Sequence, residues 1–497
     1  MMNKTLILLT LFSVAVFAQV PKSDSVSRFS YSTIAELSTQ LNEIFDDPNF
    51  GNAHWGVAIQ SLETGEYFYR RNENKLFMPA SNLKLFTTAA GLLILGKDYT
   101  FKTELLTDGN VDGSVLKGNL IVKGYGDPSI SGRFYGEDNL EIFRSWADSL
   151  LELGIDEIRG NIIGDDDNFD DIGLGDGWSW DYESYWYSAP TGALSFNDNC
   201  VDLIINPTDI GERAEIKALP SSRYAVIVNN VFTVPDDSLT SIDLYRDRGT
   251  NIITVSGSVK YSNQTIKAYA TINNPTQYFV ITLKEVLEEK GIKVTGFALD
   301  IDDLDKPLSQ KDFHLLLTHR SVPLNEIVKI INKNSHNFYA EQLLKTLGLD
   351  KSKKGTAAHG IAAEKNLFSQ MGIIPESIIL ADGSGLSRLN YVSPQHILTL
   401  LNHMYKSPVF EDFYSSLPVA GKNGTLAKRM IRTNAQDNVR AKTGFIGNVR
   451  SLSGYMRTGD NELLSFTMIA NNFNVPFVLA ENIQDLVCTR LANFKRK

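Results

Sequence analysis

Hydrophobic and polar residues change their spacing twice along this chain of 497 residues. Near the N-terminus, residues 28–95 follow the order helix, hairpin, helix. Residues 55–60 and 67–70 look like two strands joined around Thr64-Gly65. Residues 83–93 are apolar on nearly all sides, which predicts a buried helix.

The middle of the chain has a different pattern, in which short strand-like runs alternate with turn residues. Predicted strands lie at residues 120–123, 161–164, 225–229, 252–256 and 268–272, and predicted helices at 140–153 and 277–291. Helices return from residue 314, at 322–331 and 338–347. They are followed by strands at 439–443, 451–457 and 463–471 and an amphipathic helix at 478–494.

The first and last parts of the chain share one pattern of predicted helices and strands. Residues 28–95 and 314–497 are therefore predicted to form one domain of α/β class. Residues 96–313 are predicted to be a β-rich insertion, divided into two small mixed α/β domains. A chain of this length agrees with two to four domains.

Composition and charge narrow the class of protein. Hydrophobic residues make up 43% of the chain and charged residues 21%, which allows a large core and argues against global disorder. The net charge is −10 and Lys and Arg are scattered, which argues against a nucleic-acid partner.

The first residues predict export. Lys4 precedes an apolar run at residues 6–17, and Val16 and Ala18 lie where a signal peptidase reads, so residues 1–18 are predicted to be a cleaved signal peptide. The alternative is a single anchoring helix, but the run is shorter than the roughly 20 residues of a membrane span. No later stretch predicts a transmembrane anchor.

The cysteines agree with export only weakly. Cys200 and Cys488 are far apart in the sequence. They could form a disulfide, but two separate buried thiols are the favoured interpretation.

A first candidate motif stands at the start of the predicted buried helix. In Ser81-Asn82-Leu83-Lys84 the serine hydroxyl and the lysine amine share one helix face. Burial and the helix dipole would lower the pKa of the amine, so that it could act as a base, and the helix N-terminus offers an N–H to an oxyanion. Alone, the pattern is better explained by a capping serine and a surface lysine.

Two further motifs follow in order. Ser335-His336-Asn337 lies between two predicted helices; its serine could relay a proton and its amide could hold a carbonyl, although ordinary turn chemistry is the alternative. Lys442-Thr443-Gly444 lies on a predicted edge strand, where a peptide substrate could pair with the backbone. An edge lysine that guards against aggregation is the alternative there.

Together, the three motifs form the Ser-x-x-Lys, Ser-x-Asn and Lys-Thr-Gly set of penicillin-recognising acyl transferases. The chain resembles the class C low-molecular-mass penicillin-binding proteins, a D-alanyl-D-alanine carboxypeptidase/endopeptidase family. The wide separation of Lys84 from Ser335 agrees with the insertion of that family. Further matching stretches are Met78-Pro79-Ala80-Ser81, Gly126-Asp127-Pro128, Gly177-Trp178-Ser179-Trp180, Ser188-Ala189-Pro190, Asp382-Gly383-Ser384-Gly385-Leu386-Ser387-Arg388 and Gly424-Thr425-Leu426.

The resemblance implies a fold and a mechanism. The fold would be a transpeptidase-like domain whose central antiparallel sheet is flanked by helices. Ser81 would be the nucleophile towards the D-alanyl bond and Lys84 its base. Ser335 would return a proton to the leaving group. Lys442 would maintain the electrostatic field around the centre, and Asn337 would position the substrate.

The resemblance also implies substrate contacts. Thr443 would bind the terminal carboxylate, and Gly444 would let the ligand approach the backbone. The N–H groups of Ser81 and Phe445 would form the oxyanion hole. Phe445 departs from the family, where a small hydroxyl residue is common, and predicts a bulkier pocket rim.

A second group of contacts would involve the diaminopimelate side chain of the stem peptide. Asp165, Phe169 and Arg388 are the candidates, although Asp166 or Asp167 could replace Asp165. A solvated acidic loop is the alternative for this segment. A calcium loop is disfavoured because the spacing lacks the Gly and Glu of an EF-hand.

The sequence predicts neither a metal nor a cofactor, because the seven His residues lack ligand spacing and no phosphate-binding glycine loop occurs. The expected partners are peptidoglycan stem peptides, with β-lactams as covalent inhibitors. The oligomeric state, monomer or homodimer, stays open. The alternatives to a periplasmic carboxypeptidase are a β-lactamase or esterase on the same scaffold and a non-catalytic peptidoglycan-binding protein.

Overall fold

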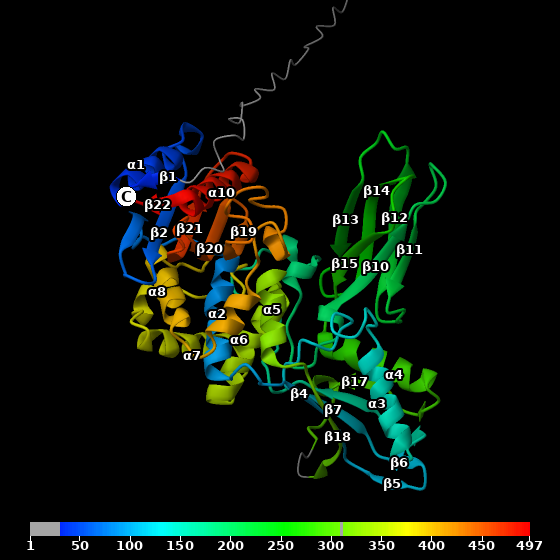
Figure 1. The fold of residues 1–497 in the computed structure, drawn as a ribbon. Helices are drawn as coiled ribbons and strands as arrows, with labels where there is room; N and C mark the ends of the chain where they lie inside the picture. Colours follow the sequence, from blue (N-terminus) through cyan, green and yellow to red (C-terminus); the bar gives the residue numbers. More distant parts are fainter. Residues whose placement is uncertain (1–29, 309–311) are drawn as a thin grey trace, which may run out of the picture.

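The computed structural model describes residues 30–308 and 312–497 (Figure 1). The predicted signal peptide at residues 1–18 lies outside this part of the chain. A body built on one sheet contains both ends of the described chain, and residues from its middle form an elongated second part beside it (Figure 1).

A five-stranded antiparallel sheet forms the centre of the body, in the order β19-β20-β21-β2-β3. Its strands are β2 (His54–Ser61), β3 (Tyr67–Arg71), β19 (Arg440–Ile446), β20 (Val449–Arg457) and β21 (Leu463–Asn471). The two central strands β20 and β21 are buried along nearly their whole length, because helices cover both faces of the sheet. This arrangement confirms the predicted α/β class, the hairpin and the final strands.

The helices of the body form two layers (Figure 1). Leu37 of α1 and Val487 of α10 join one apolar cluster with the sheet, and Phe86 of α2 and Leu400 of α8 join another. The helices are α1 (Ile34–Phe45), α2 (Lys84–Ile94), α5 (Leu324–Lys333), α6 (Asn337–Ser352), α7 (Ala357–Gln370), α8 (Pro394–Tyr405), α9 (Phe410–Ser416) and α10 (Phe477–Asn493). Residues 84–92 of α2 are all buried, as its apolar pattern predicts.

The inserted part contains four sheets. A five-stranded sheet has the order β17 (Ala298–Asp300), β9 (Ile162–Asp165), β7 (Leu120–Gly124), β4 (Lys102–Thr107) and β18 (His314–Arg320). A four-stranded sheet has the order β16 (Lys293–Val294), β8 (Glu157–Ile158), β6 (Val115–Lys117) and β5 (Asn110–Asp112). Two three-stranded sheets have the orders β11 (Glu215–Leu219), β10 (Cys200–Asn206), β15 (Ile266–Thr271) and β12 (Val226–Val234), β14 (Ile252–Lys260), β13 (Ser241–Arg246).

Helices α3 (Glu141–Glu152) and α4 (Pro275–Glu289) pack together in this part and share its core. Phe143 and Phe279 meet there with ring centroids 4.8 Å apart. The insertion therefore has an apolar core of its own. Strand β18 pairs with β4, so the inserted sheet extends through residue 320, beyond the predicted boundary at 313. The division into domains itself stays a prediction.

Short elements complete the fold. The 3-10 helices are η2 (Pro48–Phe50), η3 (Ala80–Leu83), η4 (Trp180–Tyr182), η5 (Trp186–Ser188), η6 (Asn197–Asn199), η7 (Ile301–Asp303), η9 (Pro375–Ser377) and η10 (Gly424–Leu426). Strand β1 (Ser30–Ser32) pairs in parallel with β22 (Phe494–Arg496).

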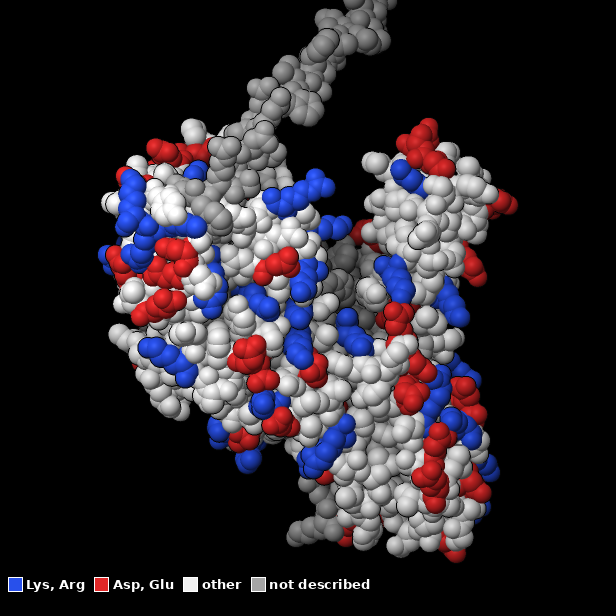
Figure 2. All heavy atoms as spheres, in the orientation of Figure 1, with Lys and Arg blue, Asp and Glu red and all other residues white. Residues whose placement is uncertain are grey.

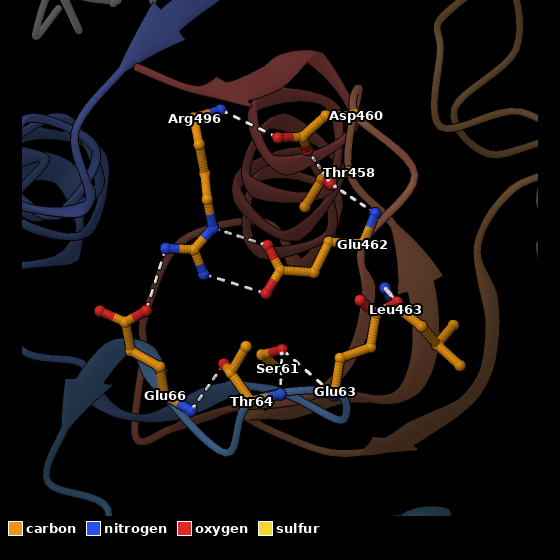
Figure 3. A network of polar contacts seen from close by, with 9 residues as sticks. All are labelled: Ser61, Glu63, Thr64, Glu66, Thr458, Asp460, Glu462, Leu463 and Arg496. Carbon is orange, nitrogen blue, oxygen red and sulfur yellow. Dashed lines mark hydrogen bonds and ion pairs between the residues drawn. The ribbon is translucent and has the colours of Figure 1, made fainter.

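Polar contacts join β22 to two turns at one end of the central sheet (Figure 3). The Arg496 guanidinium forms ion pairs with Glu462 at 2.8 Å and with Glu66 at 2.9 Å, where it reaches the turn between β2 and β3. The charge-assisted hydrogen bonds of the Arg496 guanidinium thus hold β22 in place.

The distribution of charged residues and the state of the two cysteines agree with the predictions. Lys and Arg are interspersed with Asp and Glu over the face seen in Figure 2. Cys200 and Cys488 are free and buried, so the prediction of two separate thiols is confirmed. Within residues 30–308 and 312–497, no helix is long and apolar enough to cross a membrane.

Candidate active site

Ser81 lies in η3, the turn that leads directly into the buried helix α2. The residue before it, Ala80, has φ 48°, a left-handed conformation that is costly for a residue with a side chain. Gly385 packs against this turn with φ +81°, and a Cβ there would lie 1.9 Å from the Ala80 carbonyl oxygen. Strain of this kind persists where surrounding contacts impose it, and it is common at functional sites.

Lys84 is buried one helical turn after Ser81. Its Nζ lies 3.0 Å from Ser81 Oγ, and it donates to Asn337 Oδ1 at 2.6 Å and to the Ser384 carbonyl oxygen at 2.7 Å. Lys84 is 0% exposed. Among the described residues, no carboxylate lies within ion-pair distance of this amine.

The surroundings of Lys84 change its proton affinity. Burial lowers the pKa of Lys84 to about 7, against the opposing charges of Asp382 and Glu341. A neutral amine is therefore well populated near neutral pH, and a neutral amine 3.0 Å from a hydroxyl can accept its proton.

The second and third motifs meet at a second buried lysine. Lys442 Nζ donates to Ser335 Oγ at 2.9 Å, and Ser335 has φ 58°. Burial, with a smaller contribution from the charge of Lys84, lowers the pKa of Lys442. Asn337 accepts from Lys84 through its oxygen and donates to the Tyr187 carbonyl at 2.7 Å. The three motifs, far apart in sequence, thus form one connected network.

Strand β19 carries the third motif along the edge of the central sheet, as predicted. Asn82 Nδ2 donates to the Lys442 carbonyl at 2.9 Å and joins the strand to η3. A Cβ on Gly444 would lie 2.0 Å from Ser451 Oγ and 3.1 Å from the Ser81 nitrogen, so only glycine lets the strand approach the serine. Thr443 Oγ1 donates to Thr425 Oγ1 at 2.7 Å.

Comparisons with known proteins agree with this geometry. The model of the D-Ala-D-Ala carboxypeptidase 3 (S13) family matches residues 37–493. A D-alanyl-D-alanine carboxypeptidase of Actinomadura sp. is 32% identical over 483 residues, covering 95% of this chain and 87% of the relative. The D-alanyl-D-alanine carboxypeptidase DacB of Haemophilus influenzae is 26% identical over 463 residues, covering 91% of each.

The chain belongs to the S13 family of D-Ala-D-Ala carboxypeptidases. The protein is accordingly a serine-type peptidase and a hydrolase. The crystal structure of penicillin binding protein 4 from H. influenzae is similar, with a TM-score of 0.76 and 26% identity over 92% of this chain and 98% of that one. The resemblance and the transpeptidase-like fold predicted from the motifs are confirmed.

Phe445 is the residue for which the sequence predicts a bulkier pocket rim. Its side chain is 62% exposed, and its ring is stacked by the Arg450 guanidinium at 3.6 Å, beside Phe477. Arg450 is its partner on β20 and is also paired with Glu481 at 3.2 Å. The bulk predicted for the rim therefore belongs to an aromatic and cationic stack between β19 and α10.

The three candidates for diaminopimelate recognition are separated in this S13 protein. Asp165 is 0% exposed and forms an ion pair with Lys123 at 2.6 Å. Phe169 is buried, and its ring lies where Cβ atoms on Gly126 and Gly355 would be. Arg388 is exposed and donates to the Gly447 carbonyl at 3.1 Å, at the turn between β19 and β20. Among the described residues, no hydrogen bond, ion pair or ring contact joins Asp165 or Phe169 to Ser81.

The rest of the acidic segment is divided, with Asp166 and Asp170 half-buried and Asp167 and Asp171 exposed. Asp170 pairs with Lys345 at 2.6 Å. Asp166, Asp300 and Asp302 bring carboxylate oxygens within 4.8 Å of one another beside a cavity of about 330 Å³. Burial raises the pKa of Asp166 to about 7. We assign no ion to this cluster, because acidic groups often gather without one.

Two acidic residues that support the centre were given no role in the sequence analysis, although Asp382 stands in one of the matching stretches. Asp382 accepts from the backbone of Gly385 at 2.8 Å and from Trp178 Nε1 at 2.9 Å, and so joins the stretch before Arg388 to the inserted region. Glu341 accepts from the backbone of Ser384 at 2.7 Å. The available signal was a glutamate inside the predicted helix at 338–347, directly after the second motif, since such a residue is rarely buried without a partner.

Proposed function

We propose that this carboxypeptidase cleaves the terminal D-Ala-D-Ala bond of peptidoglycan stem peptides through an acyl-enzyme on Ser81. The observation that carries the proposal is the 3.0 Å contact between Ser81 Oγ and the Nζ of a buried lysine whose pKa is lowered to about 7. An activated serine beside its base is the arrangement that nucleophilic acyl transfer requires.

In the first step, Ser81 Oγ would attack the carbonyl carbon of the penultimate D-Ala and give its proton to Lys84. The N–H groups of Ser81 and Phe445 would stabilise the oxyanion. Supporting this placement, Gly444 brings β19 within van der Waals reach of the Ser81 backbone. Asn337, which shares a hydrogen bond with Lys84, would hold the substrate amide.

In the second step, the C–N bond would break and the leaving D-Ala amine would take up a proton through Ser335. The proton that Lys84 took from Ser81 would be returned to the amine through this hydroxyl, which leaves Lys84 neutral, and the 2.9 Å contact from Lys442 Nζ would hold Ser335 in place for the transfer. Thr443 would bind the carboxylate of the leaving residue. Water would then hydrolyse the ester, with Lys84 as base.

Cleavage of D,D cross-links by the same centre and acylation by penicillins belong to this proposal. The H. influenzae relative is called a penicillin binding protein. An opened β-lactam ring stays attached to its acyl group and cannot diffuse away, so we expect a long-lived adduct on Ser81. Rapid turnover of penicillin would instead favour the β-lactamase alternative.

Export to the periplasm is also proposed. It is supported by the signal-like pattern of residues 1–18 and by the chemistry of the substrate, which lies outside the cytoplasmic membrane. N-terminal sequencing of the mature protein tests it: a chain that begins at Gln19 is expected, and a retained Met1 would contradict it.

Labelling with a tagged penicillin, followed by mass mapping of the adduct, tests the catalytic assignment. We expect the tag on Ser81, and we expect S81A to lose both the tag and D-Ala release while it keeps its melting temperature. The matched control is S369A, which removes an exposed hydroxyl from α7 and should behave like the wild type. A tag on another residue, or none, would overturn the assignment.

A further inference from the structure

A buried carboxylate lies behind the segment that holds Lys84. Glu341 on α6 is 5% exposed, and its oxygens accept hydrogen bonds from the N–H of Gly383 at 3.1 and 3.0 Å and from the N–H of Ser384 at 2.7 Å. The Ser384 carbonyl in turn accepts from Lys84 Nζ at 2.7 Å. Glu341 and Lys84 therefore hold the same short stretch of backbone through different groups.

This backbone stretch also contacts the turn that carries the serine. Gly385 packs against the Ala80 carbonyl, and Thr87 Oγ1 donates to the Gly383 carbonyl at 2.8 Å. A displacement of residues 383–385 would therefore move the acceptor of Lys84 and disturb the strained turn before Ser81. Interiors packed this closely transmit such shifts.

We propose that Glu341 is a positioning residue for the reaction: its carboxylate anchors the Gly383–Ser384 backbone, so that the Ser384 carbonyl keeps the Lys84 amine beside Ser81. The inference rests on the roles proposed above for Ser81 and Lys84. The Glu341 carboxylate forms no hydrogen bond with Ser81 among the described residues, and it acts through the backbone that it holds.

Charge gives Glu341 a second effect on the same amine. The charges of Asp382 and Glu341 both raise the pKa of Lys84 against the effect of burial. Glu341 faces Lys84, Asp382 and Glu364, and burial together with the Asp382 charge raises the pKa of Glu341 to about 7. Removal of this carboxylate should therefore lower the pKa of Lys84 as well as loosen its position.

The test is the rate of Ser81 acylation by a fluorescent penicillin, measured across the acid limb of its pH profile in the full chain. E341Q is expected to lower the rate at the optimum about 10- to 100-fold, because small misplacements of a reacting group cost this much. It should also shift the part of the acid limb near neutrality to lower pH, where Glu341 is still partly ionised, because loss of its negative charge lowers the pKa of Lys84.

Two further variants separate position from charge. E341D keeps the charge but withdraws the carboxylate from Gly383 and Ser384, so its rate should fall while its acid limb stays near that of the wild type. E364Q is the matched control: Glu364 is 1% exposed and close by, but its carboxyl accepts no hydrogen bond from the backbone of residues 383–385. Its rate and acid limb should stay near those of the wild type.

The outcomes are decisive in each case. An E341Q variant that matches E364Q in rate and acid limb would overturn the proposal. If melting curves show that E341Q does not fold, a wild-type rate in E341D would overturn it, and failure of both variants to fold would assign Glu341 to stability alone. A wild-type chain that takes no label on Ser81 would instead contradict the proposed function.

Discussion

Two buried lysines of the body, Lys84 and Lys442, have surroundings opposite to those of the half-buried Lys123 in the insertion. Lys84 and Lys442 of the body are 0% exposed and donate to hydroxyl, amide and carbonyl oxygens, all of them neutral. Lys123 of the insertion has a side chain that is 14% exposed and forms an ion pair with the fully buried Asp165 at 2.6 Å.

The difference teaches how one fold uses a buried amine in two ways. A carboxylate in direct contact favours the charged form of a lysine and offsets part of its desolvation. Neutral acceptors orient the amine but leave the cost of burial unbalanced, which lowers its pKa. The body therefore prepares a base, whereas the insertion uses the same side chain to satisfy a buried acid.

The largest effect is expected from K84M, which replaces the amine by an apolar group of similar length. Penicillin acylation of Ser81 should fall by about 10²- to 10⁴-fold, because general base catalysis is lost. The melting temperature should hold or rise, since an unpaired buried amine is removed. Stopped-flow labelling and a thermal melt measure the two quantities, and a variant that acylates at the wild-type rate would refute the assignment of Lys84 as base.

The matched change in the insertion, K123M, should have the opposite profile. It leaves Asp165 buried without its cation, so the free energy of unfolding should fall by about 3 kcal/mol. Acylation of Ser81 should stay within twofold of the wild type, roughly the scatter expected where no direct contact is lost. Denaturant unfolding and the labelling assay together test this contrast, and an unchanged stability would show that the ion pair does not have the role given to it.

The half of this contrast that concerns the body could be predicted from the sequence, and the reasons are local. Ser81 and Lys84 share one helix face, and Lys442 lies on a predicted edge strand before the turn at Gly447-Asn448. The third motif lies within β19, and the first two motifs stand where helices begin. Such positions carry capping and turn signals that short stretches of sequence reveal.

The remainder depends on contacts between distant segments. Glu341 meets Gly383 across 42 residues and Trp178 meets Asp382 across 204, and no local pattern reports such pairs. The side chain of Phe445 likewise contacts Arg450 and Phe477, which spacing along β19 does not indicate. Asp165 was predicted to contact substrate, and its burial at the end of β9 depends on the packing of the inserted sheet.

A buried acid in the body extends the comparison to the other sign of charge. Burial raises the pKa of Glu364 to about 8 from an ordinary value of 4.5, and no cation pairs with it among the described residues. The native state therefore binds more protons than the unfolded state between these two pH values, so this group makes stability fall as pH rises through that window. In E364Q this decline should be shallower; denaturant unfolding at several pH values measures it, and an equal slope in both proteins would contradict the inference.

The smallest effect is expected at Arg388, the exposed cation beside the centre. Arg388 is proposed to bind the side-chain carboxylate of diaminopimelate, while its guanidinium also donates to the Gly447 carbonyl. R388A should lower kcat/KM for a diaminopimelate-containing stem peptide about tenfold, the worth of one exposed charged contact, with no change in penicillin acylation. R388K keeps the charge without the planar guanidinium, and its kcat/KM for the peptide should lie between those of R388A and the wild type. An equal fall for peptide and penicillin would mean instead that Arg388 shapes the turn after β19. The role of Arg388 would then be structural, like that of Lys123 in the insertion.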